Sequence, residues 1–336
     1  RLRLPTRGPR VTKSLRRPLT AAAALLVVGS ALTACHVVPS EQSIAGCTPS
    51  IQPGGGSNAV VAAAGDEDAA LTDVPFSTPL ETDAPQASIV GAGSDPAEPG
   101  DVVIADYTLY DGATGDVLES TDADLLEALA AESGGQAQPA SRQLTMRTGG
   151  ESTLSQGLEC ATAGSSVALV ASYLDLFGES VAQAGVDPAS TAVIVLDVAD
   201  AFPGRAEGFP QPATAGIPAI SLATDGTPGV TFSGAEAPTD LVVGTTIAGS
   251  GRVVEESDTV IVQYTLLEWD ATTVTETTWG STPATFVLSD LIEGFQQAIV
   301  GQQVGSQVVA VVPPDLGYQD GKTLVFVIDI LDAEAP

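Results

Sequence analysis

The sequence predicts an α+β fold in which a curved antiparallel β-sheet wraps around a short α-helix. Apolar side chains alternate with the period of a strand that has one buried face, in three segments: residues 260–267, 308–312 and 324–330. Between them Ile292, Phe295 and Ile299 recur at helical spacing, and Gly301 is placed to end the helix. Such a helix is too short to be stable alone in water, so we expect the sheet to hold it.

The same pattern occurs twice in the chain. Phe76 corresponds to Phe232 and Tyr107 to Tyr264, an offset of about 157 residues. Two copies indicate a tandem duplication rather than a solenoid, which needs at least about three short repeats. Residues 203–219 are rich in Pro and Gly and are predicted to be a linker. We therefore expect domains at 72–202 and 220–336.

The distribution of charge limits the partners. Only five of the twelve Lys and Arg residues follow Cys35, whereas all 42 Asp and Glu residues do. A surface this acidic repels nucleic acid and anionic membranes, and it keeps a protein soluble. We therefore expect no nucleic-acid partner, and contact with a membrane only through an anchor.

Residues 1–34 read as a targeting segment, because a basic stretch is followed by an apolar run too short to span a membrane comfortably. Leu32-Thr33-Ala34-Cys35 resembles the lipobox of bacterial lipoproteins. This resemblance implies that Cys35 is lipidated and anchors the protein outside the cytoplasmic membrane. The alternative is an ordinary signal peptide cleaved before an incidental Cys35. We expect translation to begin at Val11, which gives a compact basic start.

Residues 35–71 are dominated by Pro, Gly, Ser and acidic residues and are predicted to be a disordered tether. If Cys35 carries lipid, Cys47 and Cys160 remain as an even pair in an exported protein, which favours a disulfide. Such a bridge would close about 113 residues and contribute on the order of 4–5 kcal/mol in the chain-entropy model. The alternative is two unrelated thiols.

The chain lacks the residues of most catalytic sites. His36 is the only histidine and lies in the expected tether, so a Ser-His-Asp or Cys-His nucleophile is excluded unless the tether folds back. No His/Cys cluster suits zinc, the Asp66-Glu67-Asp68 run lacks the spacing of a calcium loop, and the glycine runs lack a phosphate loop's Lys and Ser/Thr. We expect no cofactor. A hydrophobic cleft is what remains.

The order of segments in the second copy resembles the FKBP-type peptidyl-prolyl isomerases. A strand with Tyr264 is followed by the Leu291–Gly301 helix, the Gly305–Pro314 strand, a Leu-Gly-Tyr loop and the Leu324–Leu331 strand. The resemblance implies two FKBP-like domains and a monomeric isomerase that acts on X–Pro segments of exported proteins. The alternative is a lipoprotein that uses the same cleft only to bind peptide or protein.

The resemblance also implies roles for individual residues. Phe295 would form the pocket floor, and Tyr264 and Phe326 its walls. Leu291 and Ile292 match the family's Val-Ile pair; the Ile292 N–H and the Tyr318 hydroxyl would bind substrate carbonyls, and Glu276 would take the place of the family's pocket aspartate. Tyr264 and Phe326 are equally compatible with plain core positions. We expect a weakened pocket, because Thr275 and Ala284 stand where the family has aromatic rings and Gln319 where it has glycine. Sequence does not decide macrolide binding.

The first copy departs further from the pattern, with Leu158 in place of Phe295 and Ile194 in place of Phe326. Flat aromatic rings are what a proline packs against, and both positions lose them. We therefore expect this copy to be retained for stability or spacing, with any activity in the second copy.

Overall fold

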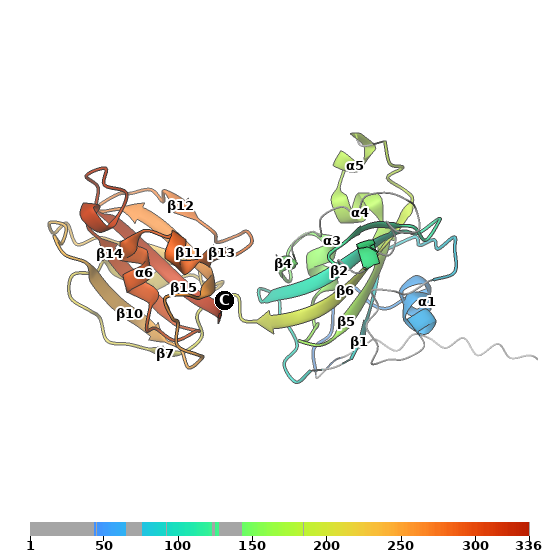
Figure 1. The fold of residues 1–336 in the computed structure, drawn as a ribbon, viewed down its shortest axis with the longest axis horizontal. Coiled ribbons are helices and arrows are strands. Elements are labelled where there is room, and N and C mark those ends of the chain that lie inside the picture. The colour runs from blue at the N-terminus through green and yellow to red at the C-terminus, as the bar shows by residue number, and fades with distance from the viewer. Residues whose placement is uncertain are drawn as a thin grey trace, which may run out of the picture. The chain divides into compact units, whose positions relative to one another are not determined.

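The structure is a computed structural model and describes residues 44, 46–64, 76–91, 93–122, 125–127, 143–183 and 185–335. The expected signal peptide, Val11, Cys35 and His36 lie outside these ranges. In the part of the chain that is described, no helix combines the length and the apolar character needed to cross a membrane. The architecture is mostly antiparallel sheet with few helices (Figure 1).

The first large sheet has the strand order β1-β5-β6-β2-β3, with β4 paired to β2, and all its pairings are antiparallel. Its strands are β1 (Gln86–Val90), β2 (Val102–Asp111), β3 (Val117–Ser120), β4 (Leu144–Arg147), β5 (Ser166–Ser172) and β6 (Thr191–Phe202). The accompanying helices are α1 (Gly55–Ala64), α3 (Thr153–Gly157), α4 (Tyr173–Phe177) and α5 (Ser180–Gln183).

The second large sheet repeats this order as β10-β14-β15-β11-β12, with β13 paired to β11 and β7 added beside β10. Its strands are β7 (Phe209–Pro210), β10 (Val242–Ala248), β11 (Thr259–Glu268), β12 (Glu276–Thr277), β13 (Ala284–Val287), β14 (Gln307–Val312) and β15 (Leu324–Glu334). It is accompanied by the helix α6 (Glu293–Ile299), the 3₁₀ turns η1 (Leu288–Asp290) and η2 (Pro314–Leu316), and a hairpin of β8 (Ala219–Leu222) and β9 (Pro228–Thr231).

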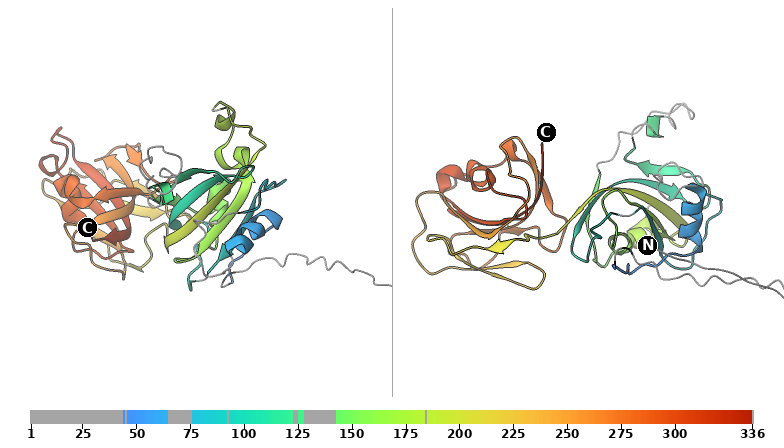
Figure 2. Two further views of the ribbon diagram at one scale, coloured as in Figure 1. Left: turned by 45° about the vertical axis from the view of Figure 1, so that its right-hand side comes forward. Right: turned by 90° about the horizontal axis from the view of Figure 1, so that it is seen from below.

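The helix α6 packs against one face of the second sheet, which curves around it (Figure 2). Close approach depends on Gly294, because a Cβ there would lie 2.3 Å from a methyl group of Val312 on β14. Gly301 follows the helix with φ +84°, a conformation that glycine adopts without strain, as its expected role as a helix stop requires.

The expectation of one buried face per strand is wrong for the second sheet. Val309, Val311, Val325 and Val327 form a separate cluster on the face away from α6. Side chains of residues 217–232, including both hairpin strands, cover this face. Both faces of β14 and β15 are therefore dry, which explains why these two strands carry apolar side chains on both faces.

The expectation of a disordered tether over residues 35–71 is wrong for residues 46–64, which the structure describes as ordered. Within them α1 forms and packs on the first sheet. Val60 is fully buried there against β5 and β6 side chains. The Oε1 atom of Gln86 accepts hydrogen bonds from the N–H groups of Gly56 (2.8 Å) and Ser57 (3.3 Å), which caps the start of the helix. Glycine permits this approach, since a Cβ on Gly54 would lie 2.2 Å from the Gln86 side chain.

A disulfide links the segment before α1 to the segment after α3, and a strand pairing links the expected linker to the second sheet. Cys47 and Cys160 form a disulfide with their Cα atoms 5.6 Å apart, within the usual range for such bonds. Within the expected linker (203–219), Phe209 and Pro210 pair with Ala248 and Ile247 of β10 at the sheet edge. An edge position suits proline, which has no N–H to donate.

Candidate functional site

A cavity of about 280 Å³ opens beside α6 in the second sheet. Its lining comes from β11, β12, β13, η1, α6 and the residues between them, the loop after η2, and β15. The lining residues are Tyr264, Glu276, Phe286, Asp290, Leu291, Ile292, Phe295, Tyr318 and Phe326. All seven residues that sequence reasoning assigned to the cleft are therefore brought together.

Four aromatic rings form one contiguous group at this cavity. The rings of Phe295 and Phe326 meet edge to face with centroids 5.3 Å apart, and that of Phe286 lies 6.3 Å from that of Phe295. Tyr264 completes the group, with centroid distances of 6.0 Å to Phe286 and 6.5 Å to Phe295. Edge-to-face pairs at these separations are favourable beyond the area they bury.

Strand register explains why these rings share one face. Leu266 of β11 lies opposite Phe326 of β15, and Tyr264 lies opposite Ile328. Because side chains alternate along a strand, Tyr264 and Phe326 project to the same side of the sheet. On the neighbouring strand, Phe286 lies opposite Val260, which belongs to the same set of positions.

The hydroxyl of Tyr264 donates a hydrogen bond to Oε1 of Glu276 at 2.6 Å. Burial raises the pKa of Tyr264, and the adjacent carboxylate raises it further, because both disfavour a phenolate. The hydroxyl therefore stays protonated and keeps donating to Glu276 throughout the physiological pH range.

Two further groups at the cavity can meet polar atoms of a ligand. Ile292 precedes the first turn of α6, so its N–H has no partner inside the helix. Tyr318 is 59% exposed and stands on the loop that follows η2. Gln319 next to it has φ +59°, the left-handed region in which glycine is favoured, so a glycine would fit here without strain.

Sequence reasoning missed two residues that line the cavity, Phe286 and Asp290. It noted that Ala284 stands where the family has an aromatic ring, and Ala284 does not line the cavity. Phe286 follows two residues later on the same face of β13 and does line it. The alternation within residues 284–287 is the signal that pointed to Phe286, whereas nothing in the sequence marked the exposed Asp290.

Comparison with known proteins places the second sheet in one family. Residues 251–331 match the sequence model of FKBP-type peptidyl-prolyl cis-trans isomerase. A probable FK506-binding protein of Corynebacterium glutamicum is 33% identical over 107 residues, which are 29% of this chain and 90% of that protein. The chain belongs to the FKBP-type peptidyl-prolyl cis-trans isomerase family.

Two further proteins are similar to this chain over about a hundred residues. An FK506-binding protein of Streptomyces anulatus is 31% identical over 117 residues, 31% of this chain and 94% of that protein. The outer membrane protein MIP of Legionella longbeachae is 33% identical over 96 residues, 26% of this chain and 41% of that protein. All nine residues that line the 280 Å³ cavity lie within the part matched to the FKBP family.

The cavity offers an apolar surface with a few polar groups at its edge. Phe295 and Phe326 are almost completely buried, at 3% exposure each, whereas Glu276, Asp290 and Tyr318 are exposed. Within the described ranges, no group of three or more His, Cys, Asp and Glu residues could hold a metal ion. Such a site can take up an apolar ring and orient the amide groups on either side of it.

Proposed function

We propose that this chain catalyses cis–trans isomerisation of X–Pro peptide bonds at the aromatic cavity of the second sheet. The barrier to rotation about a peptide C–N bond is about 18–20 kcal/mol, and X–Pro bonds take tens to hundreds of seconds to exchange. At the top of that barrier the amide has lost its resonance, so its carbonyl is less polar and more easily removed from water. A dry pocket therefore binds the twisted form better than either planar form, which accelerates rotation without a nucleophile or proton transfer.

In this proposal the proline ring packs among Phe286, Phe295 and Phe326. The N–H of Ile292 and the hydroxyl of Tyr318 hold carbonyl groups of the substrate on either side of the bond that turns. Tyr264 is held by Glu276 and forms a fixed wall. Leu291 and Asp290 lie at the rim.

The observation that carries the proposal is the group of four rings around one cavity, within the segment that matches the FKBP family. The test is protease-free exchange kinetics on a proline tetrapeptide, using the full chain. We expect a faster exchange rate that scales with protein concentration. A rate equal to that in buffer, with the cavity intact and still binding peptide, would leave a binding protein and contradict the proposal.

The proposed place of action is outside the cytoplasmic membrane, where the isomerase assists the folding of exported proteins. Two observations support this. A disulfide joins Cys47 and Cys160, and such bonds persist in oxidising compartments. A similar protein is named an outer membrane protein. Lipidation of Cys35 is the proposed anchor, and Cys35→Ser should remove both membrane fractionation and the added lipid mass.

We also propose that residues 72–202 and 220–336 are two FKBP-like domains. Support comes from the strand order, which is the same in the two large sheets. Limited proteolysis should cut within 203–219 and release two protected fragments. Cleavage inside β2 or β11 in place of the linker would contradict this division.

A further inference from the structure

One carboxylate at the aromatic cavity has no part in the isomerisation proposed above. Asp290 ends the 3₁₀ turn η1 and comes directly before Leu291 and Ile292, which line the same cavity. Its side chain is exposed. Among the residues that the structure describes, none donates a hydrogen bond to this carboxylate and no Lys or Arg forms an ion pair with it. The Asp290 carboxylate is therefore open to a cation of a bound ligand.

A second carboxylate lies at the same cavity. Oε1 of Glu276 accepts the hydrogen bond of the Tyr264 hydroxyl at 2.6 Å, which holds the Glu276 side chain at the edge of the cavity. The hydroxyl is neutral, so it does not cancel the charge of Glu276. Two acidic groups from different elements, η1 and β12, therefore stand beside one apolar site.

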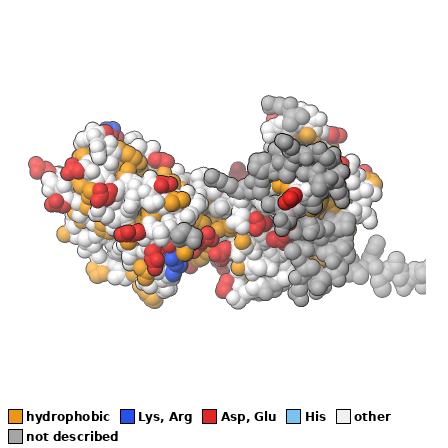
Figure 3. Space-filling model, viewed as in Figure 1, with side chains coloured by type: hydrophobic (Ala, Val, Ile, Leu, Met, Phe, Trp, Pro, Cys, Tyr) orange, Lys and Arg blue, Asp and Glu red, His pale blue; other side chains and the backbone are white. Residues whose placement is uncertain are grey.

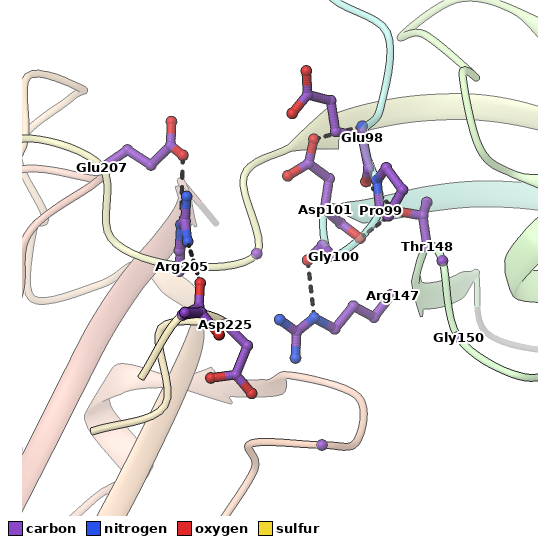
Figure 4. A pocket seen from close by; sticks show the side chains of 14 residues that line it. Glu98, Pro99, Gly100, Asp101, Arg147, Thr148, Gly150, Arg205, Glu207 and Asp225 are labelled. Atoms are coloured by element: carbon purple, nitrogen blue, oxygen red, sulfur yellow. Dashed lines mark hydrogen bonds and ion pairs between the residues drawn. The ribbon is translucent and has the colours of Figure 1, made fainter. Parts of the chain in front are cut away.

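The basic residues of the chain do not neutralise these two groups. In the described ranges, every Lys and Arg side chain has an oxygen partner elsewhere in the chain. The pairs are Arg147 with the Gly100 carbonyl, Arg205 with Glu207, Arg252 with Asp258 and Lys322 with Glu268. The first two pairs can be followed in Figure 4. None of these four basic residues lines the aromatic cavity.

The charge of the surrounding surface has the same sign. Residues 251–331 contain eleven Asp and Glu but only two basic residues, Arg252 and Lys322. Asp and Glu side chains are spread over the face of the molecule shown in Figure 3, where Lys and Arg are few. A surface of this sign attracts cationic ligands and repels anionic ones, with a range of about 8 Å at physiological salt. The field of the domain and the carboxylates at the cavity therefore favour the same kind of ligand.

The position of Asp290 suits a basic residue close to the bond that turns. The N–H of Ile292 is the proposed donor to a substrate carbonyl, and the Cα atoms of Asp290 and Ile292, two residues apart, are separated by at most about 7.6 Å. Lys and Arg have long apolar stems that lie along apolar surface while the charged end stays in water. A basic residue near the proline can therefore bring its charge to Asp290 while the proline ring is in the cavity.

We propose that Asp290 is a specificity-determining residue, and that the substrates this chain favours are X–Pro segments with a Lys or Arg next to the X–Pro pair. The cation meets the carboxylate of Asp290, and Asp290 and Glu276 together repel an acidic residue in the same place. The inference rests on the isomerisation proposed above and adds a class of substrate to it. Because this ion pair does not involve the bond that turns, it stabilises the planar and twisted forms alike, and its loss should raise KM more than it lowers kcat.

The test compares peptides that differ in one charged position. Acetyl-Z-Leu-Pro-Phe-amide and acetyl-Leu-Pro-Z-Phe-amide, with Z as Lys, Gln or Glu, are measured by protease-free exchange kinetics with the full chain at low salt. We expect kcat/KM for Lys to exceed that for Glu at least ~3-fold in one or both series, with Gln between them. About 1 M salt should bring the ratio close to one. Equal values in both series, or a preference for Glu, would overturn the proposal.

Variants separate Asp290 from the overall charge of the domain. Asp290→Asn keeps the size of the side chain and should lower the Lys-to-Glu ratio at least ~2-fold, mainly through KM. Asp290→Lys should bring the ratio below one. Glu256→Gln is the matched control, because it removes one charge from an exposed residue that does not line the cavity, and it should leave the ratio unchanged. An equal fall of the ratio in Asp290→Asn and Glu256→Gln would assign the preference to overall charge and overturn the role of Asp290.

Failure of the isomerase and failure of this preference give different results. If no peptide exchanges faster than in buffer, the proposed activity fails, and the preference is then measured as binding. The labelled methyl groups of Leu291 and Ile292 should shift during titration at lower concentrations of the Lys peptide than of the Glu peptide. Equal concentrations for the two peptides, or no shifts, would overturn the proposal for Asp290.

Discussion

The hydroxyl of Tyr264 and the carboxylate of Glu276 are joined at 2.6 Å between β11 and β12, and Tyr107 and Glu119 repeat the bond in the first sheet. In the second sheet the ring is 7% exposed while the carboxylate is exposed. The bond therefore ties a buried ring to a solvated group at the edge of the cavity. The same bond is present in both sheets although the apolar residues around it differ. We therefore infer that it holds the tyrosine ring in place independently of those residues.

Tyr264→Phe should test this directly. The change removes one hydroxyl and leaves Glu276 solvated, so the free energy of unfolding should fall by about 0.5–1.5 kcal/mol. The isomerase rate should fall less than tenfold, because the ring remains. Urea denaturation and exchange kinetics measure the two effects. Tyr107→Phe is the matched control, with a similar loss of stability expected and no change in rate.

Phe295→Ala and Tyr318→Phe should separate the floor of the cavity from its edge. Phe295 is 3% exposed and contacts the other three rings, so truncation should cost about 3–5 kcal/mol of stability and abolish isomerisation. Tyr318 is 59% exposed, and its change should alter stability by no more than about 0.5 kcal/mol while lowering the rate. A full-length Tyr318→Phe protein with an undiminished rate would exclude the hydroxyl from substrate binding.

The second sheet could be predicted from sequence because its signals are local and redundant. The alternation of apolar and polar residues predicted β11, β14 and β15. A helix was predicted from the spacing of Ile292, Phe295 and Ile299, and the structure has α6 at Glu293–Ile299. What failed depended on distant partners. The burial of the second face is caused by residues 217–232, and the helix α1 is stabilised by Gln86, so neither is visible within the segment itself.

The residues of the candidate site that lie on long strands could be predicted from sequence. Tyr264 and Phe326 are examples, because the alternation of side chains along β11 and β15 places both on the face that lines the cavity. The short strand β13 offered only four residues, and the position of a ring along it depended on its pairing with β11. Phe286 was missed for this reason, although it lies on the same face as Ala284, two residues further along the strand.

The disulfide should contribute more to stability than a single contact does. It closes a loop of 113 residues, for which the chain-entropy model gives about 4–5 kcal/mol. Cys47→Ser should lower the free energy of unfolding of the first sheet by an amount of this order, measured by urea denaturation under oxidising conditions. Wild-type protein under reducing conditions is the control and should match the variant. Equal stability of the oxidised wild type and the variant would show that the bridge constrains nothing.

Asp329 should make stability depend on pH. Its side chain is 2% exposed, and burial raises its pKa to about 6, although hydrogen bonds from the Ala206 N–H and the Gln307 amide and the charge of Arg205 oppose the rise. The folded state therefore holds this proton more tightly than the unfolded chain, whose Asp has a pKa near 3.8. By linkage, the stability that comes from this group is greatest below about pH 4 and is lost as the pH rises to about 6 and beyond, by up to about 3 kcal/mol.

Asp329→Asn should remove this dependence, because the amide oxygen still accepts from Ala206 and the side chain stays neutral at every pH. Other carboxyl groups also titrate in this range, so the quantity to measure is the difference in unfolding free energy between variant and wild type. That difference should rise in favour of the variant between pH 4 and pH 7. A flat difference for Asp329→Asn would mean that the buried carboxyl titrates alike in the folded and unfolded chains.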